Sequence, residues 1–166
     1  NSLDQEQRSK ACFAFENSKE RHTWFYTPTQ REGLRFGEMT PIQQQYVMRL
    51  ISTGLSEAGY NYACTLMGSE RMVDRFQNFP DRTYGNLPNT RVRDPANYSL
   101  GIFGLPGSSN GWSWRLGGHH LNLHFTIRNG TIHVTPAFFG AEPARAIMPG
   151  GVYLRPLAAE EDKARE

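Results

Sequence analysis

Hydrophobic residues recur at helical spacing in the first half of this 166-residue chain. In the stretch "MTPIQQQYVMRLIST", Thr40 is a good N-cap and Pro41 occupies the first helical position. Gln43 completes a capping box with Thr40. We therefore expect a helix over residues 40–53, followed after a glycine by a second helix over residues 56–79.

In the second half the hydrophobic period changes to two, which is typical of strands that bury one face. Strands are predicted at residues 112–116, 119–128 and 131–136. The dipeptides Gly117–Gly118 and Asn129–Gly130 separate them. Both dipeptides tolerate the positive φ that two-residue hairpin turns require, so the three strands should form an antiparallel meander.

A further strand is predicted at residues 98–106, where two glycines and Pro106 favour an edge strand or an irregular one. The length of the chain is sufficient for one hydrophobic core. We expect a single α+β domain over residues 1–166, with the N-terminal helices packed on one face of an antiparallel β-meander.

The two turns also predict which residues face one another. A two-residue turn at Gly117–Gly118 places Arg115 opposite His120, and one at Asn129–Gly130 places Thr126 opposite His133. One face of the meander is then apolar and should pack on the helices: Trp112, Trp114, Leu116, His119, Leu121, Leu123, Phe125, Ile127, Ile132 and Val134. The other face is polar: Ser113, Arg115, His120, Asn122, His124, Thr126, Arg128, Thr131, His133 and Thr135.

The polar face is where the sequence predicts a functional site. Its candidate catalytic residues are Arg115, His120 and Asn122, and the candidate metal ligands of the meander are His119, His120, His124 and His133. Imidazole nitrogens suit zinc or copper. Arg115 would hold an anionic group of a small-molecule ligand whose identity the sequence does not give. Antiparallel sheets also commonly leave a polar face in water, and that reading predicts no site.

Strand geometry limits how many of these histidines can share one ion. His120 and His124 lie four residues apart, about 13 Å along one strand. His124 and His133 are diagonal neighbours at ~7–8 Å and can converge. The meander therefore offers two close ligands, and others would come from a second half of the same protein or another copy of the chain. His119 points to the core unless a bulge at Gly117–Gly118 turns it towards His120.

Two other functions are compatible with the same pattern. In the first, the protein is a non-catalytic binding or structural module whose polar face pairs with another part of the protein. In the second, it is a metal-free enzyme with His120 as general base, oriented by Arg115 or Asn122. The second is the weaker hypothesis because no acidic residue lies on that face to orient the imidazole.

Composition narrows the class of protein further. The formal net charge is +2, too small to indicate a nucleic-acid partner. No apolar run approaches the ~20 residues of a membrane-spanning helix.

Cys12 and Cys64 have no metal-binding spacing and are expected as buried thiols, or as one disulfide. The opening "NSLDQEQ" resembles a mature N-terminus, which favours a periplasmic or secreted protein. The closing "AAEEDKARE" predicts a helix that begins as the sequence ends, so we expect the N-terminal part of a longer protein.

The chain resembles the domain of unknown function 3500 family of bacteria. The resemblance rests on stretches along nearly the whole sequence, such as "MTPIQQQYVMRLISTGLSEAGY", "RDPANYSLGIFG" and "GWSWRLGGHHLNLHFT". It implies a long, often exported protein with a second His-rich segment after these residues. It also implies a histidine pair at His119 and His120, with Asn usual at the position of His124, which favours His120 over His124 as a ligand. No reaction is implied by the resemblance.

Overall fold

The computed structural model describes residues 2–77, 83–84, 87–148 and 150–163. The helices are α1 (Gln5–Ala11), α2 (Ser18–His22), α3 (Pro41–Gly54), α4 (Glu57–Gln77) and α5 (Ala158–Lys163), with 3-10 turns η1 (Phe36–Glu38) and η2 (Pro95–Asn97). The strands are β1 (Cys12–Phe13), β2 (Leu34–Arg35), β3 (Thr83–Tyr84), β4 (Leu87–Arg91), β5 (Ser99–Phe103), β6 (Trp112–Gly117), β7 (Leu121–Arg128), β8 (Thr131–His133), β9 (Ala137–Phe139), β10 (Ala146–Ile147) and β11 (Tyr153–Leu154). The α+β class is confirmed.

Strands β5, β6 and β7 form the centre of a seven-stranded sheet. The outer side of β5 pairs with β1 and β2, and the outer side of β7 pairs with β8 and β9. Because β1 runs parallel to β5, the sheet is mixed, and the meander of β5–β8 is its antiparallel part. The predicted edge position of β5 is wrong, since the strand has partners on both sides. Its Gly101 instead reflects close packing, because a Cβ there would lie 3.1 Å from the ring of Phe103.

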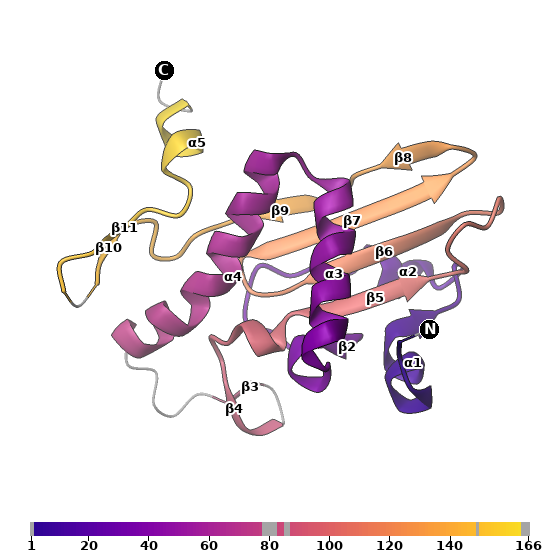
Figure 1. Cartoon of the computed structure of the whole chain (residues 1–166), viewed down its shortest axis with the longest axis horizontal. Helices are drawn as coiled ribbons and strands as arrows, with labels where there is room; N and C mark the ends of the chain where they lie inside the picture. The colour runs from indigo at the N-terminus through magenta and orange to yellow at the C-terminus, as the bar shows by residue number, and fades with distance from the viewer. Residues whose placement is uncertain (1, 78–82, 85–86, 149, 164–166) are drawn as a thin grey trace.

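Helices α3 and α4 cross the same face of this sheet (Figure 1). Thr40 caps α3 with the predicted capping box, and Pro41 occupies the first turn. Beneath the helices, Trp114 of β6 stacks on Phe125 of β7 with ring centroids 4.3 Å apart. Gly54 at the end of α3 lies against both rings, where a Cβ would come within 2.7 Å of Phe125. The apolar face predicted from the period of two is therefore the core over β6 and β7, whereas Ile132 and Val134, predicted on the same face, are exposed.

The two predicted turns have different outcomes. At Asn129–Gly130 the register is as predicted, with Thr126 opposite His133. At Gly117–Gly118 it is wrong, because Arg115 pairs with His124 rather than His120. The amide of Gly118 donates to the carbonyl of Leu121, so the turn runs from Gly118 to Leu121 with His119 and His120 at its tip, two residues further along the chain than predicted. Gly118 also packs against the ring of Tyr98, where a Cβ would come within 2.2 Å, and this contact holds the turn at this position.

The shift in register is four residues, an even number, so each strand residue keeps its predicted face. What changes is the polar face of β6 and β7, most of which is not open to solvent, whereas its continuation on β8 is exposed. Residues 14–33 cover it, and Arg115, Asn122 and His124 are 2%, 0% and 4% exposed beneath them. Arg31 holds this irregular segment together by donating to the carbonyls of Phe25, Thr27 and Thr29.

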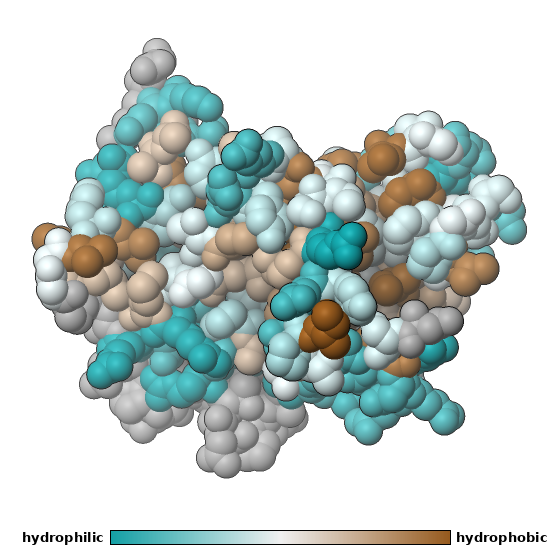
Figure 2. Space-filling view, viewed as in Figure 1, coloured by the Kyte–Doolittle hydropathy of each residue, from teal (hydrophilic) through white to brown (hydrophobic). Residues whose placement is uncertain are grey.

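The C-terminal residues extend away from the sheet. The hairpin of β10 and β11 and helix α5 project beyond α4 (Figure 1). The predicted helix at Ala158 is present. On the face that carries α3 and α4, polar and apolar side chains alternate over short distances (Figure 2). Cys12 is exposed and Cys64 half-buried, and both thiols are free. The expectation of a buried thiol is therefore wrong for Cys12, and the alternative disulfide is not formed.

Candidate metal centre

The four-residue turn between β6 and β7 brings His119 and His120 against helix α4. On the facing side of that helix lies Glu70, which is only 2% exposed. One ligand atom from each of these three residues lies within 4.8 Å of the other two. A carboxylate oxygen and two imidazole nitrogens are donors that zinc and copper accept.

His119 is oriented by the carboxylate. Its Nδ1 lies 3.3 Å from Oε2 of Glu70, and its side chain is 11% exposed. The ring of His120 stacks on that of His119, with centroids 3.6 Å apart. A carboxylate on one imidazole nitrogen fixes the ring and its tautomer, which is how ligating histidines are commonly supported.

His120 occupies an unusual backbone conformation, with φ of 64°. Few residues other than glycine and asparagine adopt this left-handed region, so the turn places His120 at some conformational cost. Burial lowers the pKa of its imidazole from 6.5 to about 3, and the neighbouring His119 and Arg93 act in the same direction. The ring is therefore neutral at pH 7, and a neutral imidazole is the form that binds a metal.

Two more buried side chains surround the cluster. The Tyr98 hydroxyl donates to the carbonyl of His119 and also lies 3.4 Å from Oε1 of Glu70. Burial raises the pKa of Tyr98 well above its usual value, so the hydroxyl stays protonated and remains a donor. Nη1 of Arg93 lies 3.9 Å from Oε2 of Glu70 and donates to the carbonyl of Glu142 at 2.8 Å. A carboxylate, a phenol and a guanidinium thus meet the two histidines at one place.

Of the residues predicted from the sequence, His119 and His120 are the two that meet at this cluster. His133 is exposed on β8. His124 is buried under residues 14–33, with Nδ1 3.1 Å from the carbonyl of Arg21. Burial lowers its pKa to about 4.

Arg115 and Asn122 also lie beneath the covering segment. Nη1 of Arg115 contacts the Glu20 carboxylate at 2.6 Å, and Nη2 donates to the carbonyl of Glu32 at 2.7 Å. Nδ2 of Asn122 donates to the carbonyl of Phe25 at 2.7 Å. Both side chains therefore hold the covering segment on the sheet.

The sequence reasoning missed Glu70, Arg93 and Tyr98. A signal for Glu70 does exist in the helical period. The buried apolar face of α4 includes Ala63, Leu66, Met67 and Val73. Position 70 continues this stripe at spacings of three and four, so an acid there falls on a buried face. For Arg93 and Tyr98, the surrounding loop sequence carries no comparable period.

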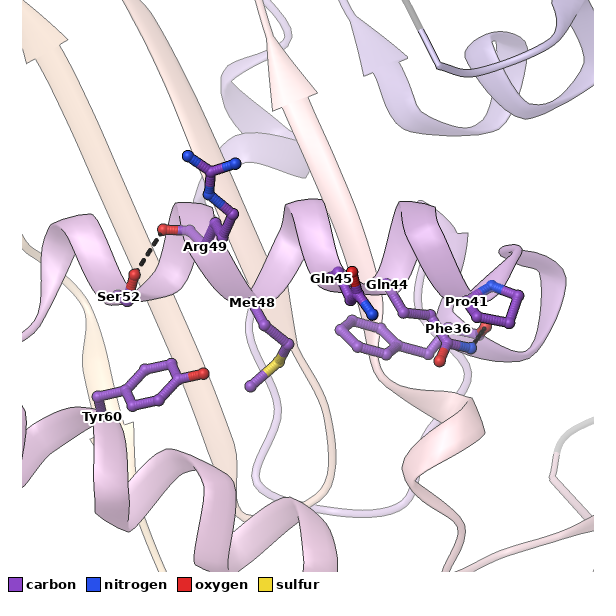
Figure 3. Close-up of a pocket in the computed structure, with 8 residues that line it drawn as sticks. All are labelled: Phe36, Pro41, Gln44, Gln45, Met48, Arg49, Ser52 and Tyr60. Carbon is purple, nitrogen blue, oxygen red and sulfur yellow. Dashed lines mark hydrogen bonds between the residues drawn. The ribbon is translucent and has the colours of Figure 1, made fainter.

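A larger open groove lies elsewhere, beside α3, with a volume of about 560 Å³. Figure 3 shows Met48 of α3 and Tyr60 of α4 on its two sides, and Ser52 hydrogen-bonded to the carbonyl of Arg49. Ten residues of α4 separate Tyr60 from Glu70, about 15 Å along the helix. Its lining holds no acid and no histidine: Phe36, Pro41, Gln44, Gln45, Met48, Arg49, Ser52 and Tyr60. We therefore place the candidate chemistry at the histidine turn.

Fold and cluster together define an α+β protein with a mixed sheet, two helices on one face and a buried Glu–His–His group beside a sheet turn. The chain belongs to the family described as Protein of unknown function (DUF3500), which matches residues 1–166, the whole chain. The resemblance expected from the sequence is thus confirmed. Comparison with curated proteins and with solved structures gave no match. Among the described residues, no helix combines the length and the apolar character that crossing a membrane requires.

Proposed function

We propose that this protein binds a divalent transition metal ion, zinc or copper, through Glu70, His119 and His120. The observation that carries the proposal is the convergence of their ligand atoms within 4.8 Å. Ligands of one tetrahedral ion with bonds of about 2.0–2.1 Å lie about 3.3 Å apart, so small side-chain rotations close the set. His120 is neutral at pH 7 because burial lowers its pKa to about 3, so it binds the ion without losing a proton.

Three protein ligands leave a tetrahedral ion with one open position, the arrangement of catalytic rather than structural zinc sites. An ion held in this way polarises a bound oxygen or lowers the pKa of a bound water. A metal ion bound in this way would therefore carry out hydrolytic or other Lewis-acid reactions. If a protein group fills the open position, that group would come from another part of the same protein or from a second copy of the chain.

A metal-free acid–base function is the second candidate, and one contact favours it. The 3.3 Å approach of Nδ1 of His119 to the Glu70 carboxylate is the geometry of an imidazole base oriented by an acid. The predicted metal-free site had His120 as base, with Arg115 or Asn122 to orient it. In this second candidate the base is His119 and the orienting group is Glu70.

Metal titration separates the two candidates. The chain is dialysed against a chelator and titrated with Zn²⁺ and Cu²⁺ by calorimetry, with bound metal counted by elemental analysis. We expect one equivalent in the wild type and at least a tenfold weaker affinity in Glu70→Gln and His120→Asn, since second-shell or ligand changes commonly cost 10–100-fold. Asparagine at position 120 tolerates the positive φ, so the turn is kept.

His133→Ala is the matched control, because it removes an exposed histidine from the same sheet. Its metal affinity should equal that of the wild type. Wild type without bound metal, or equal affinity in all four proteins, would exclude the proposal. Activity that survives complete chelation and disappears in Glu70→Gln would favour the acid–base candidate.

We also propose export to the periplasm or the medium, which the resemblance to the family implies. Fractionation of cells that express the full-length protein at its natural level tests this. Recovery in the cytoplasmic fraction alone would contradict it.

A further inference from the structure

We propose that a groove at the end of the sheet opposite the histidine turn binds the phosphate group of a small molecule between Arg21 and Arg128. This second site does not depend on the proposed metal centre. Strand β6, with six residues and a length of about 20 Å, runs from one site to the other.

Two connections of the sheet and the covering segment form the groove. The loop after β5 supplies Asn110, and the end of β7 with its turn supplies Arg128 and Asn129. Arg21 comes from the covering segment, residues 14–33. Both connections lie at the end of the sheet that is remote from α4 (Figure 1). The groove has a volume of about 480 Å³, within the range of about 300–1,000 Å³ that is usual for small-molecule sites.

Phe15 holds the half-buried Arg21 in a defined orientation. Nε of Arg21 donates to the carbonyl of Phe15 at 3.2 Å, and Cζ of Arg21 lies 4.6 Å from the centre of the Phe15 ring. In the part of the chain that the structure describes, no protein group bonds to the two Nη nitrogens. These nitrogens present a planar fork of N–H donors, the arrangement with which a guanidinium binds two oxygens of a phosphate group.

Gly111 brings Arg128 to the same place. A Cβ at Gly111 would lie 3.0 Å from Cζ of Phe15 and 3.3 Å from Cγ of Arg128, so the aromatic ring and the arginine side chain pack on one glycine. The φ of Gly111 is 104°, a conformation that residues with a side chain rarely adopt. The guanidinium of Arg128 has no hydrogen bond or ion pair with any residue that the structure describes.

The charges that line the groove favour a dianion. Two arginines and one acid, Glu16, give two positive charges and one negative charge, a sum of +1. Among the described residues, the carboxylate of Glu16 pairs with neither arginine. A phosphate monoester carries about −1.5 to −2 at pH 7 and therefore matches two guanidiniums better than a carboxylate with a single charge. The amides of Asn110 and Asn129 can bind hydroxyl groups elsewhere on the same molecule.

Titration of the metal-free chain with inorganic phosphate tests the proposal. The ¹⁵N-labelled chain is dialysed against a chelator and titrated at neutral pH and constant ionic strength, and the backbone amide shifts of Asn110 and Asn129 report on the groove. We expect saturable shifts of both amides, with phosphate bound about threefold more tightly than acetate or better. Shifts that do not saturate, or equal affinity for the two anions, would overturn the proposal.

Variants assign the binding to the two arginines. Arg21→Met and Arg128→Met should each weaken phosphate binding about fivefold or more, because each removes a charge-assisted contact. Arg49→Met is the matched control, since it removes an exposed arginine from the groove beside α3 and should change the affinity less than twofold. Glu16→Gln removes the negative charge from the lining and should strengthen binding about twofold or more.

Thermal melting establishes that each variant is folded. Wild-type affinity in folded Arg21→Met and Arg128→Met would overturn the proposal. An equal loss in Arg49→Met would also overturn it, because the affinity would then follow the net charge of the protein. His120→Asn should bind phosphate as the wild type does, and a loss there would assign the phosphate to the histidine turn instead. Failure of the metal function, measured separately with Zn²⁺ and Cu²⁺, leaves these expectations unchanged.

Discussion

Arg115 and His124 lie directly opposite each other on β6 and β7, yet both side chains take their partners from the segment that covers the sheet. Arg115 contacts the Glu20 carboxylate and the carbonyls of Glu20, Thr23 and Glu32. Nδ1 of His124 meets the carbonyl of Arg21. The pair therefore fastens residues 14–33 to the polar face of the sheet.

Replacing Arg115 by Met should destabilise the protein by about 3–5 kcal/mol, because the change leaves several buried carbonyls and a carboxylate without their donor. Urea unfolding followed by tryptophan fluorescence measures the loss. Arg128→Met, at the exposed end of β7, is the matched control and should change stability by less than about 0.5 kcal/mol. Equal stability of the two variants would contradict a fastening role for Arg115.

The stability of the protein should fall as the pH drops below 6.5, partly because of His124. Burial, the largest cause, lowers the pKa of this imidazole from 6.5 to about 4. The unfolded chain then binds a proton that the folded chain resists, so stability rises with pH and is complete only above about 6.5. Between pH 7 and pH 5, His124 should account for a loss of about 2 kcal/mol.

Unfolding free energies of wild type and His124→Asn at both pH values isolate this contribution. The variant is expected to lose about 2 kcal/mol less than the wild type over the interval, whatever its stability at pH 7. All other titrating groups are common to the two proteins. The same loss in both would show that His124 does not resist protonation in the folded state.

Leu123 tests the assignment of the core face. Its side chain is fully buried under α3 and α4, so Leu123→Ala should cost about 2–5 kcal/mol through the cavity that it leaves. Ile132→Ala on β8 removes a side chain from a residue that is 61% exposed, and it should cost less than about 1 kcal/mol. Thermal denaturation of both variants provides the comparison. An equal or larger loss for Ile132→Ala would contradict the placement of Leu123 in the core.

Gly118 links the sheet to the proposed metal site. A methyl group there would overlap the ring of Tyr98, which itself donates to the backbone of His119. Gly118→Ala should therefore displace the turn, cost about 1–3 kcal/mol, and weaken Zn²⁺ binding.

Gly68→Ala is the control on α4, since no atom lies within 4 Å of a Cβ at that position. Alanine is the better helix former, so this variant should be unchanged or more stable by up to about 1 kcal/mol and should bind Zn²⁺ normally. Normal Zn²⁺ binding by Gly118→Ala would show that the position of the turn does not determine metal binding.

Elements that depend on a few adjacent residues could be predicted from the sequence. The capping box of Thr40 and Gln43 and the Asn129–Gly130 turn formed as expected, because each depends on a few adjacent residues. At Gly117–Gly118 the same kind of signal failed. Two adjacent glycines permit the turn at more than one position, and the position depends on packing against Tyr98, which directly precedes the neighbouring strand β5.

The candidate site was predicted in part for the same reason. His119 and His120 stand out in the sequence as a pair, but their partner Glu70 is one of three acidic residues on α4 and lies far from them in the sequence. The burial of the polar face could not be foreseen, because the irregular segment of residues 14–33 has no period that reveals what it covers. Its hydrogen bonds to Arg115 and Asn122 join positions more than 80 residues apart.

Because His119 and His120 lie on the turn between β6 and β7, these two residues can be replaced without changing the core of the sheet. Pairing of β6 with β7 continues from Gly117 and Asn122 inward, and Leu121 pairs with Phe139 of β9, so His119 and His120 lie at the tip of the turn, outside the regular ladder of the sheet. A turn longer or shorter by an even number of residues changes which groups face α4 while every core side chain keeps its side. Selection or engineering can thus alter the ligand set of this region without changing the hydrophobic core. The sheet provides a constant scaffold for a turn whose ligand residues can vary.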